Sequence, residues 1–130
     1  MKIHFFVHGY AVPQGRPRFA RTEKGVIAYD PATSKGWKAS VRNQAIFNKA
    51  DNLFQGALNM ELHFYLLRPK SLPNKIEHHV KKPDLDNLMK AIKDALKGVC
   101  YRDDSQIISV TATKKYTSLN PGVAIEIMEV

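Results

Sequence analysis

Three segments of this chain alternate apolar and polar residues with a period of two. They are residues 2–8 (KIHFFVH), 59–69 (NMELHFYLLRP) and 123–130 (VAIEIMEV). That period belongs to a β-strand with one buried face. A fourth segment, residues 106–117 (QIISVTATKKYT), is rich in Ile, Val and Thr, which favour strands. The chain is therefore expected to build a sheet and to cover one of its faces with other elements.

Two further segments repeat their apolar residues at helical spacing and can supply that cover. The first runs from about residue 33 to 49, and Thr33 or Ser34 is predicted to cap its start. The second runs from about Leu85 to Lys97, and Gly98 suits the position just past its end. The inward-facing stripe of the first helix is predicted to be Trp37, Val41, Ala45 and Phe47 or Asn48. That of the second is predicted to be Leu88, Ile92, Ala95 and Leu96.

The order of these elements, β-α-β-α-β-β, predicts an α+β fold. We expect a single domain over residues 1–130, with a four-stranded mixed sheet and the helices packed on it. The turn Asn120-Pro121-Gly122 predicts that the last two strands pair as an antiparallel hairpin. Residues 11–31 and 68–83 are expected to be loops, the first with a small hairpin around Glu23-Lys24-Gly25.

The chain is strongly basic, because 20 Lys and Arg residues against 12 Asp and Glu residues give a formal net charge of +8. This charge favours a polyanionic partner, nucleic acid before an anionic membrane, and a solvated basic surface is the simpler alternative. The one cysteine, Cys100, excludes an internal disulfide and fits a reducing compartment. The first ten residues lack the apolar core of a signal peptide, and no apolar run is long enough to span a bilayer. We expect a cytoplasmic protein without a membrane partner.

Acidic residues gather at two points of this basic chain. Asp84 and Asp86 lie at the predicted start of the second helix, and Asp103 and Asp104 follow its end. Each group has an ordinary interpretation: a helix cap, an i,i+4 salt bridge such as Asp86 with Lys90, or a solvated turn. A helix of about thirteen residues is roughly 20 Å long, so the loop must return alongside it for the two groups to meet. The residues alone leave open whether it does.

If the acids converge, they suit a magnesium ion, because Mg²⁺ prefers oxygen ligands and keeps positions for water and phosphate. Such a metal would polarise a phosphoryl oxygen and activate a water for in-line attack on a phosphodiester. Lys90 lies on the same helix face as Asp86 and could stabilise the charge that develops on the phosphate. The pattern is then typical of a metal-dependent nuclease.

The stretch PDLDNLMKAIKDAL (residues 83–96), followed by DDSQI (residues 103–107), resembles the RusA-type Holliday junction resolvases of bacteria and their phages. The upstream GRPRF (residues 15–19) and Tyr29-Asp30-Pro31 are similar to the N-terminal signature of many members. The resemblance covers most of the chain. It implies a homodimeric endonuclease that cuts four-way DNA junctions symmetrically, uses Mg²⁺ and needs no small-molecule cofactor. A C2 dimer also suits the two-fold axis of a junction.

The resemblance assigns roles to individual residues. Asp84, Asp86 and Asp104 become catalytic metal ligands, and Asp103 joins the metal set as a neighbouring, supporting acid. The choice of Asp104 as the third ligand rests on aligning the acid pair by the Ser-Gln-Ile that follows. Lys90 becomes the catalytic or phosphate-stabilising lysine. Contacts to the DNA backbone are expected from Arg16, Arg18, Lys81, Lys82 and Lys93.

Several residues keep two interpretations. Gln14 stands where many relatives have Lys, so one DNA contact is expected to be lost there. Asp94 matches a recurring acid within the helix, and His78-His79 is expected to be an ordinary polar loop pair rather than a zinc site. Phe19 either wedges into a junction or anchors its loop. Two other functions also stay open: a non-catalytic protein that binds DNA junctions, and a nuclease for another branched DNA.

Overall fold

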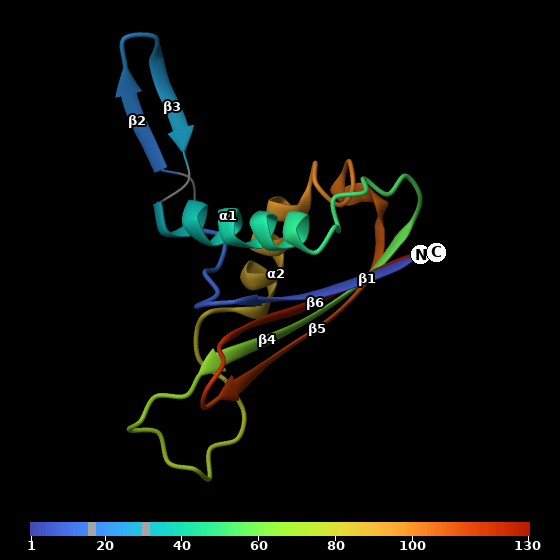
Figure 1. Cartoon of the computed structure of the whole chain (residues 1–130). Coiled ribbons are helices and arrows are strands. Elements are labelled where there is room, and N and C mark those ends of the chain that lie inside the picture. Colours follow the sequence, from blue (N-terminus) through green and yellow to red (C-terminus); the bar gives the residue numbers. More distant parts are fainter. Residues whose placement is uncertain (16–17, 30–31) are drawn as a thin grey trace.

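Four strands of the chain form one mixed sheet, and two helices pack on it (Figure 1). The computed structural model describes residues 1–15, 18–29 and 32–130. The order across the sheet is β1-β6-β4-β5. The predicted α+β class is confirmed, and so are all four predicted strands. Their bounds are Lys2–His8 for β1, Leu58–Leu67 for β4, Ile107–Thr117 for β5 and Gly122–Glu129 for β6.

The sheet is mixed because β4 has one parallel and one antiparallel neighbour. β4 runs parallel to β5, with Met60 opposite Val110. On its other side β4 is antiparallel to β6, and Leu62 lies opposite Ile125. Ile125 in turn faces Phe5 of β1, which is also antiparallel to β6. The second helix therefore connects two neighbouring parallel strands, as in a β-α-β unit.

The predicted hairpin of the last two strands is wrong, because β4 lies between β5 and β6. The burial of the strands gives the reason. Val123, Ile125 and Ile127 of β6 are buried, so this strand takes a central place. β5 has no buried residue and contains Thr and Lys side chains that suit an edge. The short connection after β5 therefore crosses the end of β4 instead of closing a hairpin.

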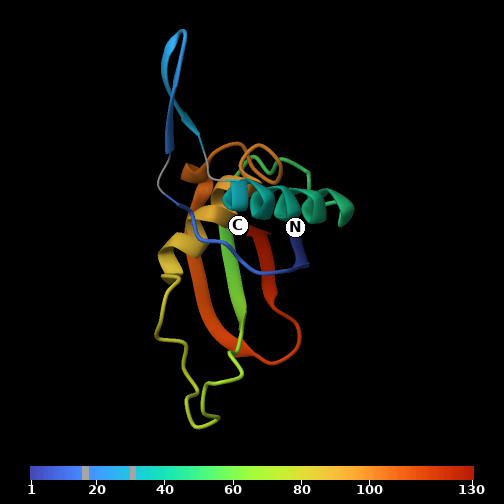
Figure 2. The same cartoon turned by 90° about the vertical axis from the view of Figure 1, so that its left-hand side faces the viewer.

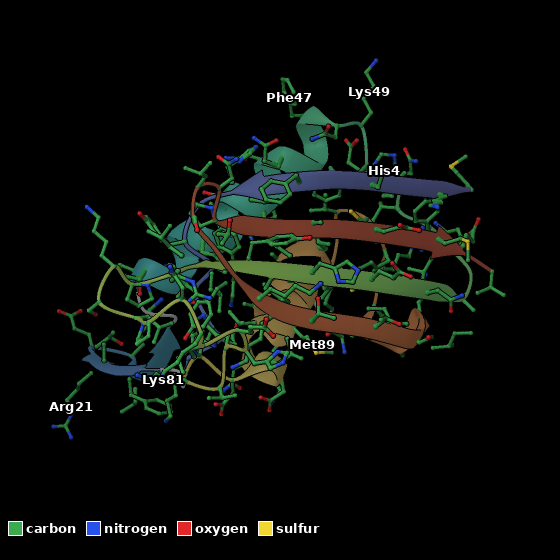
Figure 3. The ribbon with its side chains drawn as sticks, turned by 90° about the horizontal axis from the view of Figure 1, so that it is seen from below. His4, Arg21, Phe47, Lys49, Lys81 and Met89 are labelled. Carbon is green, nitrogen blue, oxygen red and sulfur yellow. The ribbon has the colours of Figure 1, made fainter. Side chains whose placement is uncertain are left out.

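The helices α1 (Ala32–Phe47) and α2 (Leu85–Leu96) cover the same face of the sheet (Figure 2). The opposite face has no helix over it in the part of the chain that the structure describes (Figure 3). The core between helices and sheet confirms the predicted stripe of α2 and most of that of α1. It contains Trp37, Val41 and Ala45 of α1, Leu88, Ile92, Ala95 and Leu96 of α2, and Leu58, Met60, Leu62 and Phe64 of β4.

Two details of the prediction for α1 are wrong. The helix already begins at Ala32, so Thr33 and Ser34 lie inside it and do not cap it. Phe47 is 80% exposed, so the buried stripe ends at Ala45. The chain turns away at Lys49, whose φ of 57° lies in the left-handed region and cannot continue a helix.

A second, two-stranded sheet follows β1 in the chain. It consists of β2 (Arg18–Thr22) and β3 (Gly25–Tyr29), so the predicted hairpin around Glu23-Lys24-Gly25 is confirmed and is longer than expected. Figure 1 shows this hairpin standing apart from the rest of the molecule. Phe19 on it is 69% exposed. Among the described residues, no helix is both long and apolar enough to cross a membrane.

Candidate active site

The first pair of acids lies at the start of α2, as predicted. Asp84 occupies the N-cap position, with extended backbone angles, and its carbonyl accepts the Leu88 N–H at 3.1 Å. Its carboxylate makes no capping hydrogen bond within the described structure. Asp86 follows in the first turn, and both acids are exposed. The positive end of the helix dipole favours their charge, and both carboxylates are available for another ligand.

The segment that leads into α2 is held by a lysine from the sheet. Lys114 of β5 donates from Nζ to the carbonyl of Lys81 at 2.8 Å and to that of Pro83 at 3.0 Å. These bonds fix the chain just before Asp84, so Lys114 positions the first acid pair. Sequence reasoning missed this role, because Lys114 is 31 residues from Pro83 in the chain.

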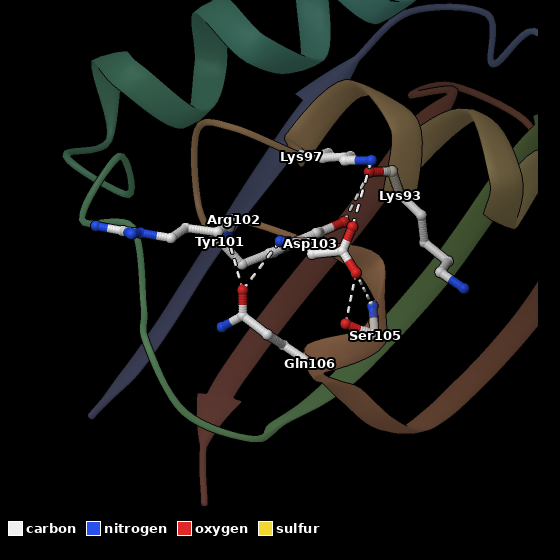
Figure 4. A network of polar contacts seen from close by, with 7 residues as sticks. All are labelled: Lys93, Lys97, Tyr101, Arg102, Asp103, Ser105 and Gln106. Atoms are coloured by element: carbon white, nitrogen blue, oxygen red, sulfur yellow. Dashed lines mark hydrogen bonds and ion pairs between the residues drawn. The ribbon is translucent and has the colours of Figure 1, made fainter.

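The second pair of acids lies in the loop between α2 and β5, and Asp103 organises this loop (Figure 4). Its carboxylate accepts hydrogen bonds from the Ser105 N–H at 3.1 Å and from the Ser105 hydroxyl. The Gln106 side chain accepts the Asp103 N–H at 3.0 Å, which completes a capping box at the start of the short 3-10 helix Asp104–Gln106. The Lys97 ammonium lies 3.4 Å from the Asp103 carboxylate. The Ser105 hydrogen bonds, with help from Lys97, lower the pKa of Asp103 to about 2.

Asp104, by contrast, is turned back toward α2. It is half-buried and lines a cavity of about 280 Å³, the Asp104 cavity, together with Gln14, Lys90, Lys93 and Asp94. Its Oδ1 atom is buried and has no hydrogen-bond partner among the described residues. The loop after α2 therefore does return alongside the helix, the point that the sequence left open. It brings Asp104 beside the predicted Lys90.

Gln14 enters the Asp104 cavity from a distant part of the chain. Its backbone N–H donates to the Asn87 carbonyl at 2.9 Å, which ties the segment after β1 to the first turns of α2. Its side-chain Oε1 is buried and lacks a partner within the described structure, like Asp104 Oδ1. The sequence predicted only a lost DNA contact at this position. The structure instead adds a second oxygen donor to the cavity, which a lysine would not supply.

Asp94 and Lys93 are fixed by residues outside the predicted site. The side chain of Lys38 on α1, only 3% exposed, lies 2.6 Å from the Asp94 carboxylate. The Tyr101 hydroxyl donates to the Lys93 carbonyl at 2.7 Å, and burial, followed by the charge of the neighbouring Asp104 carboxylate, raises the pKa of Tyr101. The sequence identified Asp94 only as a recurring acid within the helix and gave no sign of Lys38, 56 residues away.

The structure gathers only part of the predicted metal set. Asp104 meets Lys90 and Lys93 in one cavity, whereas Asp84 and Asp86 do not line it. Asp86 precedes Lys90 by four residues, roughly 6 Å along the helix axis. Within the described residues no group of three or more His, Cys, Asp or Glu side chains is placed to hold a metal ion. The magnesium site of Asp84, Asp86 and Asp104 therefore stays a prediction.

The predicted DNA contacts lie in three places. Lys81 and Lys82 are exposed in the loop before α2, and Lys93 is half-buried in the Asp104 cavity. Arg18 begins β2, and Arg16 lies outside the described residues, as do Asp30 and Pro31 of the N-terminal signature.

Comparison with known proteins decides the family. A family model described as "Endodeoxyribonuclease RusA" matches residues 8–128. The chain belongs to the RusA endodeoxyribonuclease family. It is also similar to the uncharacterized protein YqaN of Bacillus subtilis (strain 168), with 36% identity over a 138-residue alignment that covers 98% of this chain and 96% of YqaN. The resemblance drawn from the two acidic motifs is confirmed: this RusA-family chain is a nuclease of a family that resolves Holliday junctions.

Proposed function

We propose that this RusA-family protein is a magnesium-dependent endonuclease that resolves four-way DNA junctions by paired phosphodiester cleavage, in recombination and repair. The observation that supports this most is the position of Asp104. Its unpartnered oxygen lies in a cavity with Lys90 and Lys93, on the flank of a helix that begins with Asp84 and Asp86. Carboxylates next to lysines are the combination that a phosphodiester and a cation need together.

The donor atoms near Asp104 fit Mg²⁺ in kind. Asp104 Oδ1 and Gln14 Oε1 are buried oxygens without a partner among the described residues, and Mg²⁺ prefers oxygen ligands. Asp84, Asp86 and Asp104 would hold the ion. When bound, it would polarise the phosphoryl oxygen and lower the pKa of a coordinated water. Asp103 is a poorer candidate for a ligand, because its carboxylate already accepts two hydrogen bonds from Ser105.

The side chains of the protein supply the remaining chemistry. Lys90 and Lys93 place positive charge where negative charge develops on the phosphate. Asp103 holds the loop so that Asp104 faces the helix, and Lys114 holds the segment that presents Asp84. Lys81 and Lys82, with Arg16 and Arg18, contact the DNA backbone and set its register without reading sequence.

A homodimer completes this proposal. A four-way junction has a two-fold axis, and its resolution needs two matched cuts, so a C2 pair of subunits with one site each supplies both. The net charge of +8 on each subunit favours the approach of a junction, where four duplexes concentrate phosphate charge. We expect the protein to act in the cytoplasm, where chromosomal or prophage DNA recombines.

Cleavage of a synthetic four-way junction tests the function, with three-way and linear duplex DNA as comparison substrates. We expect symmetric paired cuts in the four-way junction with Mg²⁺ and none with EDTA. The Asp84→Asn variant should lose cleavage yet bind the junction as well as the wild type or better, because less negative charge faces the DNA. Normal cutting by Asp84→Asn would refute the metal assignment. Preferential cutting of three-way DNA would favour a different branched substrate.

A further inference from the structure

We propose that a second cavity, beside the start of α2, receives an unstacked nucleobase of the bound DNA. This tyrosine cavity, about 420 Å³ in volume, lies at the end of the sheet where β1 and β4 finish and α2 begins. Its aromatic lining comes from Tyr10, Tyr65, Tyr116 and His79, and its basic lining from Lys81 and Lys82. The inference rests on the proposed function, since it assigns a subsite for the same DNA.

The lining has the two components that single-stranded DNA needs. Aromatic side chains stack on bases without regard to sequence, and cations beside them hold the backbone. Here the tyrosines supply the rings, and the exposed Lys81 and Lys82 supply the charge. Burial and the neighbouring Lys114 ammonium lower the pKa of His79, which favours the neutral ring as an aromatic surface.

Part of this aromatic group has a structural role that must be separated from binding. Tyr116 is a residue of β5, and its ring contacts the loop: its centroid lies 4.7 Å from that of the His79 ring and 4.8 Å from the Arg68 guanidinium carbon. Arg68 also donates to the carbonyls of Pro73 and Ile76. These contacts hold residues 68–83 on the sheet. Tyr116 and His79 therefore form a structural wall of the cavity. Substituting either residue would disturb the loop as well as any DNA binding.

Tyr10 is the residue that packing does not explain. It lines the tyrosine cavity but is 71% exposed, and no hydrogen bond or ring contact of its side chain is found among the described residues. Its backbone is held by the preceding residue, because the Gly9 N–H donates to the Pro121 carbonyl at 3.0 Å. An exposed ring on a fixed backbone, facing an aromatic wall, can close on a planar group with little loss of chain entropy.

The tyrosine cavity adjoins the proposed catalytic acids. Pro83 lines it, and Asp84 is the next residue. Lys114 donates hydrogen bonds to the carbonyls of Lys81 and Pro83, so the same lysine holds the cavity wall and the segment that leads to the first acid. A base held here belongs to a nucleotide close to the scissile phosphate. Bases next to the exchange point of a junction are the ones that lose a stacking neighbour, so their extrusion requires the least free energy.

An abasic scan combined with Tyr10→Ala tests the inference. Each nucleotide near the exchange point is replaced in turn by an abasic analogue, and binding of the junction is measured with Ca²⁺ in place of Mg²⁺ to prevent cutting. At one or two positions beside the cut, we expect loss of the base to weaken wild-type binding about tenfold. In Tyr10→Ala that penalty should vanish, and in Tyr10→Phe it should return.

Phe47→Ala is the matched control. Phe47 is 80% exposed at the end of α1, and Figure 3 shows it on the opposite side of the molecule from Lys81. The Phe47→Ala variant should show the same loss of junction binding at abasic positions as the wild type. If the wild type cleaves junctions normally but shows the same abasic penalties as Tyr10→Ala at every position, the nucleobase subsite is wrong. The proposed function would not be affected by that result. Failure of the wild type to bind or cut junctions would overturn the proposed function and the subsite with it.

Discussion

At the scale of single residues, the adjacent acids Asp103 and Asp104 have different environments. Asp103 is bonded to Ser105 and Lys97, whereas Asp104 Oδ1 lacks a partner within the described structure and lies beside Lys90. We expect Asp104→Asn to lower the cleavage rate at least about a hundredfold and to leave thermal unfolding unchanged, because the variant removes a proposed metal ligand but no packing. Asp103→Asn is the matched control and should retain much more activity. Equal losses in both variants would contradict this division.

Asp103 should instead make stability depend on pH. Its pKa is lowered from 3.8 to about 2 in the folded protein, so folding favours its charged form. The stabilisation is complete above the unfolded pKa and is lost as pH falls through the folded value near 2. Urea unfolding from pH 6 to 2 should therefore show a steeper loss of stability in the wild type than in Asp103→Asn. Parallel curves would show that this carboxylate does not contribute.

At the scale of elements, the link between β5 and α2 is the least obvious requirement of the site. Lys114→Met removes both hydrogen bonds to the segment before Asp84. We expect cleavage to fall about ten- to a hundredfold through misplacement of that acid, with a change in unfolding free energy of about 1 kcal/mol. Lys115→Met, at the next and exposed position of β5, is the control. A similar loss in both variants would indicate a general effect of charge rather than positioning.

The β2–β3 hairpin gives a second prediction at this scale. Phe19 is 69% exposed, so it does not anchor the hairpin to the core, and the wedge is the better of its two interpretations. Phe19→Ala should leave thermal unfolding unchanged and weaken junction binding about tenfold, because an exposed ring stacks on bases. Val26→Ala on the facing strand, where Val26 is 64% exposed, is the control. Unchanged junction binding in Phe19→Ala would contradict the interpretation that Phe19 wedges into the junction.

Elements were predictable from the sequence where local chemistry decides them. α2 begins at Leu85 as expected, because Pro83 and Asp84 mark its start, and the Gly98 φ of 82° suits the turn that follows it. The strand order was not predictable, since pairing of β6 with β4 depends on which strand is the more buried. The return of Asp104 along α2 could only be inferred from family resemblance. The contacts of Lys38 and Lys114 join segments far apart in the chain, and nothing local to either lysine signals them.

At the scale of the whole molecule, paired cleavage requires two active sites on one junction. In the proposed homodimer each subunit would carry one site, so a mixed dimer with one Asp104→Asn subunit should cut one strand. The readout is a supercoiled plasmid with an extruded cruciform: two cuts give a linear product, and one cut gives a nicked circle. After subunit exchange at equal concentrations, about half of the dimers should be mixed by simple statistics. The nicked product should therefore rise as the linear product falls.

Wild-type protein diluted to the same active concentration is the control for this experiment, and it should keep the ratio of linear to nicked product unchanged. Dilution lowers the number of active dimers, whereas mixing changes their composition. A ratio that also stays constant in the mixed sample would mean that subunits do not exchange or that each acts alone, and sedimentation at the same concentrations distinguishes the two. If the subunits prove monomeric, the two-fold symmetry of the junction must be matched by independent binding events, and paired cutting would then depend steeply on protein concentration.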